Sequence, residues 1–154
     1  MAEAPLTFPG IVPGLCGKRS LVVSETMTTV HAGGGGILTA SSMIMEMEIT
    51  AQIVTQPYLP DDHTTVGYEI CVRHRRPIPV GESFTVSAEF LEVDGKRLLF
   101  RVEARNAREL IGEGMLRRAI VRHRDSGRAK ESSRVRGELT RSAECTPANR
   151  SPAS

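Results

Sequence analysis

The segment Thr39–Thr55 constrains the fold more than any other part of the sequence, because it predicts one long helix. A glycine run precedes it, and Pro57 follows it. Proline lacks a backbone N–H and disfavours helix at the residue before it, so the helix should end near Gln56. A helix that is apolar on two sides is normally buried on both. The two apolar stripes at helical spacing are Met43, Ile44, Met47, Ala51 and Val54, and Met45, Ile49 and Ile53.

Glu48 lies between the two stripes and shares a face with Gln52 and Thr55, which follow at i+4 and i+7. A carboxylate in a wrapped helix is costly unless it is paired, exposed in a cleft or used. The more common outcome for such a residue is a partly solvated flank. Periodicity alone does not distinguish Glu48 from Glu46, which lies at the other edge of the first stripe.

Downstream of the helix the sequence predicts four strands in close succession, joined by short turns. Along the first of them, alternation puts Val66, Tyr68, Ile70, Val72 and His74 on one face. Asp94-Gly95 is a hairpin signal. Short connections favour antiparallel neighbours, so we expect an α+β fold with an antiparallel sheet on one helix. The predicted strands are Arg19–Glu25 before the helix and His63–Arg75, Ser83–Val93, Arg97–Asn106 and Leu110–Arg122 after it.

The regions around these elements have a different character. Residues 1–18 predict an extended lead that is rich in proline and glycine, and residues 124–154 have almost no apolar residues, which indicates a disordered tail after the domain at 19–123. An RNA-binding arm is an alternative for the tail, but its mixed charges favour a solvating role. Thr26–Leu38 should be a mobile loop; a phosphate cradle is less favoured because no Lys-Ser/Thr follows its glycines.

Composition excludes several classes of function. The 154 residues fit one domain, and 40% of them are hydrophobic, which allows a real core. Tryptophan is absent, which argues against an aromatic surface that stacks on nucleic-acid bases. The net charge is only +2, which argues against a strongly basic surface that binds nucleic acid. We see no signal peptide and no apolar run near the roughly 20 residues that span a bilayer. The spacing of Cys16, Cys71 and Cys145 predicts neither a disulfide framework nor a metal site, so we expect a cytoplasmic protein that binds no metal. With the observations above, we also expect no membrane or nucleic-acid partner.

His74 is the second candidate for chemistry, while Cys71 is most simply a small buried apolar group. His74 lies on the apolar face at the end of its predicted strand. A lone histidine there is more often structural than catalytic. If it meets Glu48 in a dry cleft, the imidazole and the carboxylate could share general acid/base work.

Three stretches carry a family resemblance: ILTASSMIMEME, HTTVGYEICVRHRRPIPVGESFTVSAEF and EVDGKRLLFRVEARNARELIGEGMLRRAIV. The most specific parts are the TTVG…H…P.P.GE segment and the IGEG…R…IV strand. Over about residues 19–123 the chain resembles the hotdog-fold thioesterases of the fluoroacetyl-CoA thioesterase type. The resemblance implies a hotdog fold, with a long central helix wrapped by a five-stranded antiparallel sheet. It also implies a homodimer with joined edge strands and an active site at each subunit interface.

The resemblance implies roles for individual residues. Glu48 and His74 fall on the family's catalytic glutamate and histidine, Gly67 on a glycine that lets the thioester approach closely, and Arg118 on an arginine of the last strand. The family's hydroxyl residue at the helix start falls on Ala40. Its role would then pass to Thr39, Ser41 or Ser42, and Leu116 replaces a histidine that is frequent in the last strand.

These observations give two main hypotheses. In the first, the protein is an acyl-CoA thioesterase for a small acyl group, with Glu48 as base or nucleophile and His74 assisting proton transfer. Backbone N–H groups near Ala40 and Ser41 would polarise the thioester carbonyl. We expect no separate cofactor, because coenzyme A enters only as part of the substrate. In the second, the domain binds an acyl-CoA without hydrolysing it. A hotdog dehydratase is a weaker alternative, because the spacing shows no Asp-His pair. Rim arginines at 73, 75 and 76 would hold the CoA phosphates or be solvated surface charge.

Overall fold

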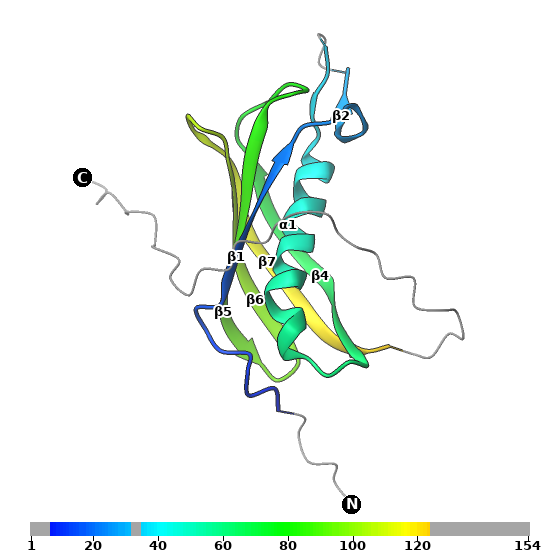
Figure 1. Ribbon diagram of the computed structural model, residues 1–154, viewed down its shortest axis with the longest axis vertical. Helices are drawn as coiled ribbons and strands as arrows, with labels where there is room; N and C mark the ends of the chain where they lie inside the picture. The colour runs from blue at the N-terminus through cyan, green and yellow to red at the C-terminus, as the bar shows by residue number, and fades with distance from the viewer. Residues whose placement is uncertain (1–6, 32–34, 124–154) are drawn as a thin grey trace, which may run out of the picture.

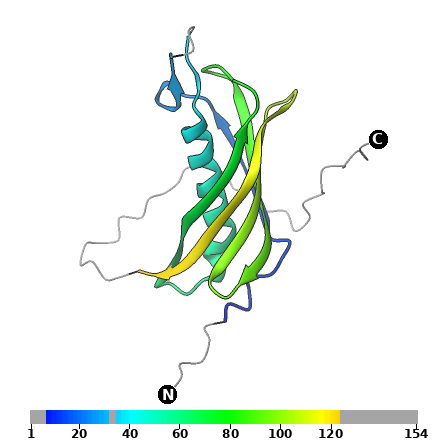
Figure 2. The same cartoon turned by 180° about the vertical axis from the view of Figure 1, so that it is seen from behind.

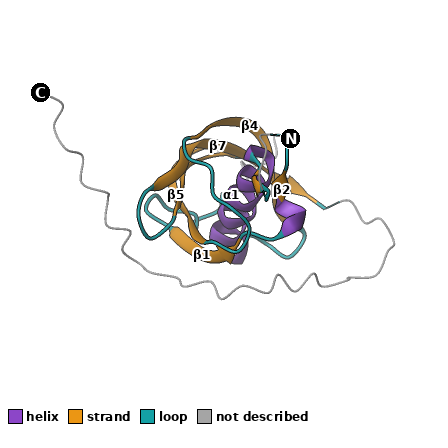
Figure 3. Cartoon of the chain, turned by 90° about the horizontal axis from the view of Figure 1, so that it is seen from above, coloured by secondary structure: helices purple, strands orange, loops and turns teal. Residues whose placement is uncertain are grey.

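The computed structural model describes residues 7–31 and 35–123, and in them a curved five-stranded antiparallel sheet wraps one long helix (Figures 1 and 3). The helix, α1 (Ala40–Thr55), lies in the concave side of the sheet. The α+β hotdog architecture expected from the sequence is confirmed. The strands of the sheet are β1 (Cys16–Val22), β4 (His63–His74), β5 (Ser83–Asp94), β6 (Arg97–Arg105) and β7 (Leu110–Arg122), in the order β1-β5-β6-β7-β4.

The ends of α1 follow from local chemistry. The Thr39 hydroxyl accepts a hydrogen bond from the Ser42 amide at 3.1 Å and so satisfies one of the free donors of the first turn. At the other end α1 passes into the short 3-10 turn η2 (Gln56–Tyr58), which contains Pro57. The helix therefore has the bounds that the sequence predicted, within one residue.

The first apolar stripe of α1 packs into the core, but the second is not covered within one chain. Met43, Met47 and Ala51 are fully buried against the sheet. Met45, in contrast, is 59% exposed, and Ile49 and Ile53 are half-buried. The expectation of burial on both sides is thus wrong for a single subunit, because the sheet covers only one side of the helix (Figure 1).

Sheet topology puts β4 at an edge. β4 pairs only with β7 within the described chain, although β5 follows it in sequence, so these two consecutive strands are not neighbours. Figure 2 shows β4, β7 and β6 side by side from the outer face. The other edge strand, β1, begins at Cys16, earlier than the predicted Arg19, because its whole length pairs with β5.

A bulge in β4 changes which residues face the helix. The pairing register with β7 shifts between Gly67 and Glu69, so Tyr68 and Glu69 both face the outer side of the sheet, where they line one groove. Before the bulge, Thr65 and Gly67 face α1. The predicted inward position of Val66 and Tyr68 is therefore wrong; their exposed fractions are 45% and 46%.

Two further expectations are corrected by the structure. Cys71 is an exposed free thiol on β4, and not a buried apolar group. The segment Thr26–Leu38 is not entirely loop: η1 (Glu25–Met27) leads into a small hairpin of β2 (Thr28–Thr29) and β3 (Ile37–Leu38). Part of the glycine run, residues 32–34, and the predicted tail, residues 124–154, lie outside the described residues. In the described part of the chain, α1 is too short and too polar to cross a membrane.

Candidate active site

The Glu48 carboxylate lies directly over the backbone of β4 at Gly67. A Cβ atom built on Gly67 would be 2.0 Å from Glu48 Oε1, far inside van der Waals contact. The Glu48 side chain remains 30% exposed. Glycine at position 67 therefore lets the carboxylate occupy a partly open position between the helix and the edge strand.

A buried arginine accompanies this carboxylate. Arg118, on β7, is 4% exposed and approaches Glu48 Oε1 with Nη1 at 3.4 Å. Its Nε donates to the Thr65 hydroxyl at 2.9 Å, and its Nη2 donates to the Thr65 carbonyl oxygen at 2.8 Å. Burial lowers the pKa of Arg118 from its ordinary value, and the nearby Glu48 charge opposes this effect. The guanidinium is thus held from one side by Thr65 and presents its positive charge to Glu48.

Thr65 was not identified as a site residue from the sequence. A signal was present, because Thr65 and Gly67 are two residues apart and so share a face of an extended strand. Arg118 and Gly67 are directly opposite one another in the β4–β7 ladder, so the three residues meet at one point of the sheet.

The neighbouring helix carboxylate has a different environment. Glu46 Oε2 accepts a hydrogen bond from Arg19 Nη1 at 2.8 Å, and the two side chains are 17% and 5% exposed. This close pair joins α1 to β1, on the other side of the helix from β4. Glu46 is therefore held by a close structural partner, whereas the arginine beside Glu48 is more distant, at 3.4 Å.

His74 lies at the far end of β4, next to the start of α1. It is opposite Gly112, and a Cβ on Gly112 would be 2.5 Å from the Met43 sulfur. Burial lowers the pKa of His74 from its ordinary value, and a backbone hydrogen bond at Arg76 partly opposes this. Its Nε2 atom is buried and has no hydrogen-bond partner in the described residues. In the neutral imidazole this leaves a ring nitrogen available to a substrate or a reacting proton.

Within one subunit the structure does not bring Glu48 and His74 together. Gly67, beside Glu48, and His74 are seven positions apart on β4, about 20 Å along an extended strand. A single chain thus presents two separate groups of candidate residues along one edge strand: Glu48 with Gly67 and Arg118, and His74 with the start of α1.

The start of α1 offers hydroxyl and amide groups. The Thr39 hydroxyl lies 3.1 Å from the Ser41 hydroxyl and donates to the Ser42 hydroxyl at 2.9 Å. Ala40 and Ser41 are exposed, and their amides have no hydrogen-bond partner among the described residues. Ser41 lies on the same face of the helix as Glu48, seven residues before it. The backbone donors expected near Ala40 and Ser41 are thus free to bind an oxygen atom.

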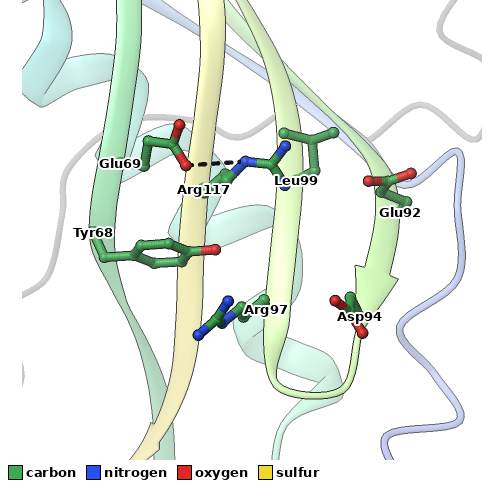
Figure 4. Close-up of a pocket in the computed structure, with 7 residues that line it drawn as sticks. All are labelled: Tyr68, Glu69, Glu92, Asp94, Arg97, Leu99 and Arg117. Carbon is green, nitrogen blue, oxygen red and sulfur yellow. Dashed lines mark ion pairs between the residues drawn. The ribbon is translucent and has the colours of Figure 1, made fainter.

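The groove that Tyr68 and Glu69 line, on the outer face of the sheet, has a volume of about 350 Å³ (Figure 4). The Tyr68 ring lies under the Arg97 guanidinium at 5.7 Å, and Glu69 is ion-paired with Arg117 at 3.1 Å (Figure 4). These charges already have partners, and the groove is on the opposite face of the sheet from Glu48. Elsewhere in the described chain, no three His, Cys, Asp or Glu side chains form a group that could hold a metal ion.

Comparison with known proteins now gives the family. The family model described as fluoroacetyl-CoA-specific thioesterase matches residues 22–124. The chain belongs to this family. A curated relative, the fluoroacetyl-CoA thioesterase of Streptantibioticus cattleyicolor, is 37% identical over 79 residues, which cover 51% of this chain and 57% of the relative. This match therefore spans little more than half of the relative's length.

Solved structures agree with the family and the fold. The fluoroacetyl-CoA thioesterase FlK superposes with a TM-score of 0.69 at 30% identity, over 73% of this chain and 90% of that one. A thioesterase-superfamily protein from Thermus thermophilus superposes with a TM-score of 0.66 at 26% identity, over 73% and 85% of the two chains. A hot-dog-like protein from Thermanaerovibrio acidaminovorans, at 19% identity and a TM-score of 0.66 over 71% and 83%, supports the fold alone.

Proposed function

We propose that the protein is an acyl-CoA thioesterase that hydrolyses a small acyl-CoA. The observation that carries the proposal is the Glu48 carboxylate, which lies over Gly67 and beside the buried Arg118 in a chain of this family. An FlK variant related to this chain was solved with fluoroacetate and CoA, which are the two products that such a reaction would release from fluoroacetyl-CoA. A cytoplasmic location, as expected from the sequence, is part of the proposal.

The proposed enzyme is a homodimer joined through β4. This strand pairs with β7 on one side only, so its other side has no strand partner in the described chain, and its residues from Val66 to Cys71 are all exposed. Ile70, at 48% exposed, and the uncovered Met45 on α1 add apolar surface beside it. Unpaired strand edges pair readily with another strand, and a two-fold axis makes such pairing antiparallel.

Antiparallel pairing of two β4 strands would also bring the Glu48 group of one chain beside the His74 group of the other. If the axis passes near Ile70, the end of one strand lies beside the beginning of the other. His74 of the partner subunit would then approach Gly67 and Glu48. The site would be incomplete in either chain alone, which explains why the two groups are separated within one subunit.

The reaction would follow from the chemistry of these groups. Glu48 would either take a proton from a water molecule that attacks the thioester carbonyl or attack it directly, and both routes end with water cleaving the acyl group. The free amides at Ala40 and Ser41, at the positive end of the helix dipole, would stabilise the oxyanion. The proton released by the water molecule would pass through His74 to the departing CoA sulfur. The products are a carboxylate and free CoA thiol.

The direct test is release of free thiol from a panel of short acyl-CoAs. Glu48→Gln should lose most of this activity, because the amide can neither accept a proton nor act as a nucleophile. Glu46→Gln is the matched control on the same helix, and its activity per folded molecule should be close to that of the wild type. Equal turnover by Glu48→Gln and the wild-type protein would remove Glu48 from the mechanism.

One observation favours a second candidate, an acyl-CoA binding protein without hydrolysis. The family's hydroxyl position is Ala40, and the nearby Thr39 hydroxyl is used as the helix cap. Tight calorimetric binding of acyl-CoA without any thiol release would select this function over the thioesterase.

Complementation tests the shared site. Glu48→Gln and His74→Ala proteins are each expected to be inactive, but a mixed dimer would contain one intact site. Random exchange of subunits in an equal mixture should therefore restore about a quarter of the wild-type activity, because half of the dimers are mixed and each has one working site. A mixture that exchanges subunits and stays inactive would contradict a site built from two chains.

A further inference from the structure

A cavity of about 780 Å³ at the end of β4 connects the His74 imidazole to a cluster of arginines. Its lining consists of Arg73, His74, Arg75 and Arg76, of Glu109 in the turn before β7, and of Leu110, the first residue of β7. The arginine-bearing turn is fixed in place, because the amides of Arg75 and Arg76 both donate to the Ile111 carbonyl oxygen, at 2.7 and 3.1 Å.

The three arginines differ in what they already contact. Arg75 is hydrogen-bonded and ion-paired to Glu113, with its Nε at 3.0 Å from the carboxylate. Arg76 Nε lies 3.3 Å from Glu109. Arg73 is exposed and has no ion pair in the described part of the chain. Three positive and two negative side chains therefore leave the cluster with a net charge of +1.

A stronger anion would displace the glutamates from these two arginines. All four side chains in these ion pairs are between 37% and 63% exposed, and such surface pairs contribute little stability. A phosphate group carries more charge than a carboxylate, and the planar guanidinium binds its oxygens in a fork. The unpaired Arg73 would meet the phosphate first, with Arg76 released from Glu109 to join it.

We propose that this cavity holds the phosphate groups of the coenzyme A part of the substrate, with Arg73 as its main ligand. The inference rests on the proposed function, because it makes the thioester's leaving group the anion. The position of the cavity agrees with this, since the same cavity is lined by His74, whose imidazole would assist proton transfer to the CoA sulfur. Arg73, Arg75 and Arg76 thus select for the full coenzyme over a shorter thiol.

The test compares two thioesters that differ only in the nucleotide. Arg73→Ala should raise the KM for acetyl-CoA about tenfold, the loss expected for one charge-assisted contact, and leave kcat unchanged. The KM for acetyl-pantetheine, which lacks the phosphates, should not change. Arg97→Ala is the matched control, because Arg97 is also an exposed arginine but lies on the outer face of the sheet, away from the cavity. An unchanged KM for acetyl-CoA, or an equal rise for both thioesters, would overturn the phosphate assignment.

A second variant tests the same cavity in the opposite direction. Glu109→Gln removes the carboxylate that competes for Arg76, so the KM for acetyl-CoA should fall several-fold. A rise in KM would contradict the proposed role of Arg76.

Direct binding separates this inference from the proposed function. Adenosine 3′,5′-bisphosphate, titrated into the full-length protein by calorimetry, should bind to the wild type and to Arg97→Ala, and should bind much more weakly to Arg73→Ala. If no acyl-CoA is hydrolysed but this pattern is observed, the thioesterase proposal fails and the phosphate site stands. If acyl-CoA is hydrolysed but the three proteins bind the nucleotide equally, the phosphate site fails alone.

Discussion

The substitution Gly67→Ala should lower activity strongly and change stability little. The added Cβ would be 2.0 Å from Glu48 Oε1 and 3.3 Å from its carboxyl carbon, while ordinary contact begins at 3.4 Å. The carboxylate oxygen must therefore retreat by about 1.4 Å. A displacement of about 1 Å at a reacting group can cost about a hundredfold in rate, so we expect a fall of this size in kcat/KM for acetyl-CoA. This corresponds to about 2.7 kcal/mol of activation free energy.

Stability should change much less than activity. The clash involves only the end of a flexible glutamate side chain, and alanine loses less conformational freedom on folding than glycine. Thermal unfolding should therefore occur close to the wild-type temperature. Gly114→Ala is the contrasting control, because its Cβ would lie 2.1 Å from the Cys71 carbonyl oxygen and the backbone would have to move. Gly35→Ala, with no atom within 4 Å, should be neutral. Wild-type kcat/KM in Gly67→Ala would show that the carboxylate does not react from its position over β4.

Three further predictions concern the neighbours of the site. Thr65→Val removes the acceptor of the buried Arg118 Nε, which should cost about 1–3 kcal/mol of unfolding free energy and lower kcat. Thr65→Ser, which keeps the hydroxyl, should restore both, and equal defects in the two variants would contradict the role of the hydroxyl. Glu46→Gln should destabilise by about 3 kcal/mol in urea unfolding, because it leaves Arg19 buried without its partner. Because burial lowers the pKa of His74 below its usual 6.5, the unfolded chain binds the proton more readily, so stability is lost as pH falls below about 6.5. In His74→Gln the melting temperature should fall less between pH 7 and 5, and an unchanged fall would assign that loss to other groups.

The helix could be predicted from the sequence almost to the residue because its ends depend on local chemistry. Thr39 caps the N-terminal end, and Pro57 prevents the helix from extending much further at the C-terminal end. The later strands followed from alternation, which depends on neighbours in sequence. The family resemblance then identified Glu48 in preference to Glu46, which periodicity could not do.

Features set by long-range contacts could not be predicted in this way. The bulge at Tyr68 arises from the register between β4 and β7, and no local pattern indicates it. The same is true of the separation between β4 and β5, which depends on where the other strands pair. The role of Thr65 appears only when β7 brings Arg118 beside it.

The two glutamates of α1 explain what marks a carboxylate as functional in this fold. Glu46 is the more buried, and its 2.8 Å contact with Arg19 is the better ion pair. That pairing removes it from chemistry, because a reacting proton would have to compete with a close, buried partner. Glu48 has a more distant arginine at 3.4 Å, a larger exposed fraction and a glycine instead of a side chain in front of it. Its arginine is in turn fixed by Thr65, so the positive charge stays beside the carboxylate without forming a close ion pair with it. Availability beside a fixed charge, and not burial, therefore distinguishes Glu48 as the proposed reacting group.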